Sequence, residues 1–150
     1  MGKITEILNA AQNRAKELNL PYEGAMLPAE AYEIWRNAPG AKLVDVRSRA
    51  ELDFVGRIPG AVEIEYQSWP GMKVNPHFMN AMQQQVDKES LVMFICRTGG
   101  RSGMAAQLAM QSGYLDCYNV LQGFEGDATP DKQRGKINGW KALGLPWEQM

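Results

Sequence analysis

The chain has 150 residues, of which 45% are hydrophobic, and its formal net charge is −1. This length suits one domain, and the hydrophobic fraction excludes a globally disordered chain. The slightly acidic balance argues against a domain that binds the nucleic-acid backbone, so any anion recognition has to be local.

The amino-terminal region shows no membrane span or signal peptide, because polar residues interrupt its apolar positions between Ile4 and Leu20. Two cysteines without the spacing of a disulfide framework favour a reducing compartment. Two cysteines and a single histidine also match no zinc-ligand pattern. We therefore expect a cytoplasmic protein without a metal, a nucleic-acid partner or a membrane partner.

The apolar pattern predicts helices alternating with strands. In chain order, helices are expected over residues 4–18, 27–40, 49–56, 78–86, 101–112 and 139–145. Strands are expected over residues 42–46, 61–66, 90–95 and 117–121. Pro and Gly predict loop structure over residues 68–78, and a long polar loop is expected between residues 122 and 139.

The first predicted helix has a narrow, Ala-rich apolar stripe that includes Ala11 and Ala15. Such a stripe favours a helix docked on the domain over one that binds a partner or a membrane. The alternation of predicted strands and helices after this first helix implies an α/β fold with a parallel sheet covered on both faces. Ligands of such folds bind outside the carboxyl ends of the strands, and Cys96 is placed at such an end.

The segment "FICRTGGRSG" combines a cysteine, two arginines and two glycines between a predicted strand and a predicted helix. A helix amino terminus and nearby arginines favour the nucleophilic thiolate of Cys96. Gly99 and Gly100 allow backbone amides to point inward and form an anion-binding nest. The residues expected to bind the substrate anion are Arg97, Thr98, Gly99, Gly100, Arg101 and Ser102.

The second cysteine, Cys117, begins an apolar strand. It is interpreted either as a core residue or as a resolving partner of Cys96. The only histidine, His77, gives no evident Cys/His pair and is expected in a loop or at a helix start.

Three segments together carry a family resemblance: "LVDVRSRAELDFVGRIPGA", "VMFICRTGGRSGMAA" and "NVLQGFEGD". In this order and spacing they resemble the rhodanese family of single-domain sulfurtransferases, and "GWKALGLPW" resembles the end of such domains. The resemblance implies a compact α/β domain with a parallel five-stranded sheet and a loop cysteine that carries a sulfane sulfur as a persulfide. We expect an amino-terminal helical extension over residues 1–26 and a rhodanese-like domain over residues 27–150.

Two other features are interpreted beside this resemblance. Asp45 and Arg47 in "VDVR" resemble a family signature and are expected to form a fold-supporting ion pair or to support the loop from behind. The family often has His where this chain has Arg57, a position that we expect to support the fold.

Related folds are found in dual-specificity phosphatases, whose loop has five residues between cysteine and arginine. Here four residues separate Cys96 from Arg101, which favours a tight cradle for one transferred sulfur. The resemblance therefore implies transfer from a donor such as thiosulfate to cyanide, to a thiol or to a protein acceptor. This transfer is expected to require no cofactor, because the covalent intermediate is a persulfide on Cys96. The alternative is a persulfide carrier or interaction module in sulfur trafficking without efficient turnover.

Overall fold

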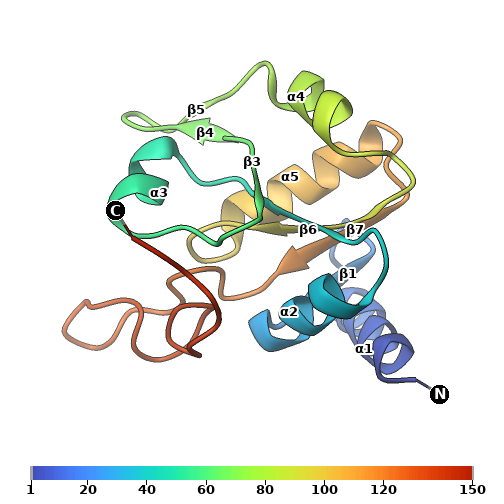
Figure 1. The fold of residues 1–150 in the computed structure, drawn as a ribbon, viewed down its shortest axis with the longest axis horizontal. Coiled ribbons are helices and arrows are strands. Elements are labelled where there is room, and N and C mark those ends of the chain that lie inside the picture. The colour runs from blue at the N-terminus through green and yellow to red at the C-terminus, as the bar shows by residue number, and fades with distance from the viewer. Residues whose placement is uncertain (1, 150) are drawn as a thin grey trace.

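The computed structural model describes residues 2–149 and has a central sheet with helices on both faces (Figure 1). The described helices are α1 (Lys3–Glu17), α2 (Pro28–Asn37), α3 (Arg49–Phe54), α4 (Phe78–Gln85) and α5 (Gly100–Gln111). The sheet consists of β1 (Gly24–Met26), β2 (Lys42–Asp45), β3 (Val62–Glu63), β6 (Leu91–Ile95) and β7 (Asp116–Val120). All its pairings are parallel, in the order β1-β7-β6-β2-β3. The predicted α/β fold with five parallel strands and an extra amino-terminal helix is confirmed.

The central strands are buried on both faces, and alternate residues sort into two cores. In β6, Val92 and Phe94 face the core shared with α4 and α5, together with Cys96 just after the strand. Met93 and Ile95 face the second core, which α1 and α2 cover together with Trp140. This arrangement places α4 and α5 on one side of the sheet and α1 and α2 on the other (Figure 1).

Helix α1 docks on the edge strand β1 through small side chains. Ala11 and Ala15 are buried, and a Cβ at Gly24 would lie 3.1 Å from the Ala11 carbonyl carbon. Small residues at this contact allow the two backbones to approach closely. The prediction of a docked helix is confirmed. None of the described helices combines the length and apolarity that crossing a membrane requires.

Four local expectations differ from the structure. Strand β1, which ends at Met26, was not predicted, and it pairs with β7 at the edge of the sheet. The predicted strand over residues 61–66 has only two residues in β3. The expected loop at residues 68–78 includes a short antiparallel ladder between β4 (Gln67–Ser68) and β5 (Lys73–Val74). The predicted helix over residues 139–145 is wrong, because this segment forms turns with Gly139 and Gly144 at positive φ.

Candidate active site

Cys96 lies directly after β6, between β2 and β7 at the carboxyl ends of the strands. Its side chain is 1% exposed. The backbone amide of Gly99 donates a hydrogen bond to Cys96 Sγ at 3.1 Å, and helix α5 starts at the next residue. Gly99 has φ +112°, a conformation that favours glycine. The loop thus presents an amide donor and a helix amino terminus to the sulfur, as predicted.

Ser102, in the first turn of α5, places its hydroxyl 3.2 Å from Cys96 Sγ. The same hydroxyl donates to Asn119 Oδ1 of β7 at 2.5 Å. Both side chains are buried. Asn119 Nδ2 donates to the Gly99 carbonyl and to the Tyr22 hydroxyl, each at 3.1 Å. The sequence analysis named Ser102 but missed Asn119 and Tyr22.

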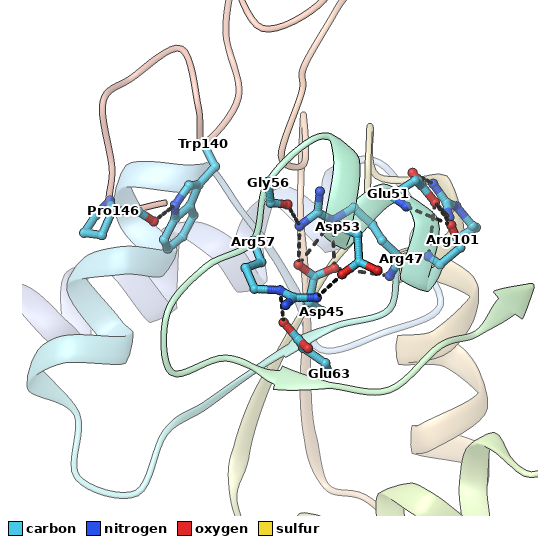
Figure 2. Close-up of polar contacts among 11 residues, drawn as sticks. Asp45, Arg47, Glu51, Asp53, Gly56, Arg57, Glu63, Arg101, Trp140 and Pro146 are labelled. Atoms are coloured by element: carbon cyan, nitrogen blue, oxygen red, sulfur yellow. Dashed lines mark hydrogen bonds and ion pairs between the residues drawn. The ribbon is translucent and has the colours of Figure 1, made fainter. Parts of the chain in front are cut away.

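Arg101 is held by Glu51 of α3, a residue that the sequence analysis did not connect with the loop. Its Nη1 and Nη2 atoms lie 2.6 and 2.8 Å from the two Glu51 carboxylate oxygens (Figure 2). Burial raises the pKa of Glu51, but the hydrogen bonds and charge of Arg101, with bonds from Ser48, outweigh it and lower this pKa to about 2. Burial lowers the pKa of Arg101, whereas Glu51 and then the charges of Cys96 and Asp45 raise it, so the net shift is upward.

A pocket of about 320 Å³ lies at this loop, and both of the loop's arginines line it. Its other lining residues are Glu51, Val55, Trp69, Met72 and Glu125. Arg97, Thr98 and Gly100 are exposed, whereas Arg101 is partly buried. The two lining arginines are balanced by two glutamates. An anion in this pocket would therefore be held by directed N–H donors and not by an excess of positive charge.

Asp45 and Arg47 form a fully buried ion pair at the end of β2 (Figure 2). Arg47 Nε and Nη2 donate to the Asp45 carboxylate at 2.9 and 2.7 Å, and Nη2 also donates to the Gly56 carbonyl at 2.9 Å. The guanidinium carbon lies 4.1 Å from the centroid of the Phe124 ring. Arg57 pairs with Asp53 and Glu63 in the same region.

The turn after β7 is bonded to the backbone of the loop. The amides of Phe124 and Glu125 donate to the carbonyls of Cys96 and Arg97 at 2.8 and 3.0 Å. Gly123 has φ +64°, and a Cβ there would lie 2.5 Å from the Cys96 carbonyl oxygen. Arg47 therefore contacts, through the Phe124 ring, the turn that is bonded to the loop. The two interpretations of its pair with Asp45, fold support and support of the loop from behind, stay predictions.

A family model for the rhodanese-like domain matches residues 27–128, which include β2, the Cys96 loop and the turn after β7. The chain belongs to the rhodanese-like family. Membership of this family supports sulfurtransferase activity in general.

Relatives and solved structures agree with this assignment. An uncharacterised protein of Rickettsia conorii is 34% identical over 122 residues, covering 79% of this chain and 92% of the relative. The crystal structure of Rv0390 from M. tuberculosis has 37% identity and a TM-score of 0.79, covering 86% of this chain and 99% of that one. The polysulfide-sulfur transferase homodimer of Wolinella succinogenes shares the fold, with a TM-score of 0.60 at 20% identity over 99% of this chain and 95% of that one.

The second cysteine of this rhodanese-like domain is a core residue of β7. Cys117 is fully buried and pairs in register with Val92, four residues before Cys96 on the neighbouring strand. That offset corresponds to about 13 Å along the strand, too far for a disulfide without backbone movement. Burial, then the charges of Asp116 and Glu23, raise the pKa of Cys117 to about 12. The core interpretation of Cys117 fits this geometry.

Proposed function

We propose that this rhodanese-like domain moves a sulfane sulfur from a donor such as thiosulfate to cyanide or a thiol, through a persulfide on Cys96. The observation that carries the proposal is the contact of Cys96 Sγ with the Gly99 amide at the start of α5. A donor amide and a helix amino terminus both favour negative charge on sulfur. The pocket beside the loop is lined by the N–H donors of Arg97 and Arg101.

In the first half-reaction, the Cys96 thiolate attacks the outer sulfur of thiosulfate. A bond forms between Cys96 Sγ and that sulfur, the sulfur–sulfur bond of the donor breaks, and sulfite leaves with the electron pair. Arg97 is exposed and free to turn toward the leaving anion. Two of the five N–H donors of Arg101 bond Glu51, which leaves three for the anion.

In the second half-reaction, the carbon of cyanide or the sulfur of a thiolate attacks the outer sulfur of the persulfide. The sulfur–sulfur bond breaks, its electron pair returns to Cys96 Sγ, and the product leaves. The Gly99 amide and the amino terminus of α5 stabilise the regenerated thiolate. The transferred sulfur is itself the covalent intermediate, so this cycle uses no other cofactor. One nucleophile that serves two substrates in turn predicts ping-pong kinetics.

One feature supports the alternative of a persulfide carrier with a protein acceptor. Cys96 is 1% exposed, while Trp69, at the edge of the pocket, is 64% exposed. An exposed tryptophan beside a buried reactive group is a suitable contact for a protein that brings its own thiol to the loop. The carrier would load one sulfur on Cys96 and hold it until this partner docks.

Both cysteines are free, which suits a reducing compartment, and we propose the cytoplasm as the site of action.

Steady-state formation of thiocyanate from thiosulfate and cyanide distinguishes the enzyme from the carrier. We expect many turnovers for the native chain and for Cys117→Ser, and none for Cys96→Ser. A single sulfur loaded and held would favour the carrier. Hydrolysis of a generic aryl phosphate that depends on Cys96, with thiosulfate inert, would overturn the proposal in favour of phosphatase chemistry.

A further inference from the structure

The amide of Asn119 has one defined orientation. Its Nδ2 atom lies 3.1 Å from the carbonyl oxygen of Gly99, and a carbonyl can only accept a hydrogen bond. The nitrogen must therefore face Gly99, and the opposite Oδ1 atom faces Ser102. Nδ2 donates its second hydrogen to the Tyr22 hydroxyl, at 3.1 Å. Three neighbours thus fix the side chain in place.

This orientation determines where the single hydrogen of the Ser102 hydroxyl lies. Asn119 Oδ1 carries no hydrogen, so the 2.5 Å contact requires Ser102 to donate. A lone pair of the Ser102 hydroxyl oxygen then faces Cys96 Sγ, which lies 3.2 Å away. A lone pair accepts a hydrogen bond from a thiol but repels a thiolate.

We propose that Asn119 is a positioning residue that turns the Ser102 hydroxyl hydrogen away from Cys96 and thereby limits the fraction of resting thiolate. Two contacts on the sulfur then act in opposite directions. The Gly99 amide favours the charged sulfur, whereas the Ser102 lone pair favours the protonated sulfur. When the thiol proton leaves to solvent, the hydroxyl can stabilise the thiolate only by rotating away from Asn119, which leaves a buried Oδ1 without its donor.

Charged and titratable groups from several elements surround this sulfur. Arg101 is one of them, and its charge interacts with that of Cys96. The other groups near the loop are Arg97 of the loop itself, Glu51 of α3, Asp45 at the end of β2, Arg47 two residues after it, Glu125 after β7, and Tyr22 after α1. Substitutions at Ser102 and Asn119 change none of these charges, so a shifted midpoint in these variants does not come from a lost or added charge.

The test follows the ultraviolet absorbance of the Cys96 thiolate against pH, with each variant referenced to the same variant carrying Cys96→Ser. Cys117 stays protonated over the useful range because of its high pKa. Asn119→Leu frees the hydroxyl to donate to sulfur, so the pH midpoint should fall by about one unit, a tenfold rise in thiolate below the midpoint. In a Ser102→Ala background, the same change should leave the midpoint unmoved. Ser102→Thr, which retains the hydroxyl, should keep the native midpoint.

The competing explanation is that Asn119 acts only by holding the loop through Gly99. Loss of that contact would displace the Gly99 amide from the sulfur and raise the midpoint, with or without the Ser102 hydroxyl. That result would overturn the proposal.

If Asn119→Leu does not fold, Ser102→Ala alone decides. The proposal predicts that the pH midpoint of Cys96 does not rise in this variant. If the native hydroxyl instead donated to the sulfur, its loss would raise the midpoint. Tyr22→Phe keeps the Asn119–Ser102 bond and should keep the midpoint. This inference concerns the same sulfur as the proposed function, but its readout needs no sulfur transfer, so the two can fail separately.

Discussion

Glu51 of α3 and Arg101 of α5 form a two-point ion pair, with nitrogen–oxygen distances of 2.6 and 2.8 Å. The Glu51 carboxylate also accepts bonds from the backbone amide and hydroxyl of Ser48 at the start of α3. One carboxylate therefore caps α3 and orients Arg101 in the first turn of α5. This contact links the segment after β2 to the segment after β6 at the edge of the pocket.

The ion pair predicts a defined pH dependence of stability. The pKa of Glu51 is lowered from its ordinary value of 4.5 to about 2, so the pair stabilises the fold fully above about pH 4.5 and is lost as pH falls toward 2. Glu51→Gln should lower the free energy of unfolding at neutral pH by about 1–2 kcal/mol, because the pair is partly solvated. Urea unfolding of both proteins from neutral pH down to pH 2 measures this difference.

Glutamine at position 51 retains the capping contact with Ser48, so the difference between the two proteins isolates the charge. It should shrink between pH 4.5 and 2. A difference that stays constant across that range would contradict a role for the carboxylate charge.

The two loop arginines should differ in what they contribute. Arg97 is exposed, so Arg97→Ala should leave the melting temperature near that of the native chain while raising KM for thiosulfate roughly tenfold, through loss of one charge-assisted contact. Arg101→Ala leaves Glu51 without its partner and should cost about 1–3 kcal/mol of stability as well as activity. Calorimetry and steady-state kinetics on both variants measure this contrast. Equal stability losses in the two variants would refute it.

Gly123 should be required for the shape of the loop. Gly123→Ala would bring a Cβ to 2.5 Å from the Cys96 carbonyl oxygen, so the loop or the turn has to move. Gly40 is the matched control, because it has a similar φ of +76° with nothing within 4 Å of the added Cβ. Gly40→Ala should cost only about 1–2 kcal/mol of backbone strain. Gly123→Ala should cost more and reduce kcat on the order of 100-fold, since small displacements of a nucleophile are expensive. Equal effects of the two substitutions would contradict the proposed contact.

The long periodic elements of the fold could be predicted from the sequence, and the short ones could not. The apolar run in β6 and the helical spacing in α5 each extend over enough residues to show their type. Strand β1 has three residues and includes Gly24, so it carries no pattern of its own and depends on pairing with β7. The segment at residues 139–145 has helical spacing, but Gly139 and Gly144 at positive φ end it on both sides.

The site was predictable where its residues are adjacent in the sequence. Cys96, Gly99 and Ser102 lie in one short segment of the sequence, and the structure brings their polar atoms together. Glu51 resembles an ordinary capping residue in its own segment, so its contact with Arg101, fifty positions away, is visible only in three dimensions. Asn119 gave one usable signal, because it is a polar residue between Tyr118 and Val120 in the buried part of β7.

The measurement that tests the central claim most directly is the intact mass of the protein after exposure to thiosulfate under non-reducing conditions. The native chain and Cys117→Ser should each gain the mass of one sulfur atom and lose it on addition of cyanide, and Cys96→Ser should gain none. Peptide mapping should locate the added sulfur on Cys96. A sulfur that loads on Cys96→Ser, or that maps to Cys117, would contradict the account.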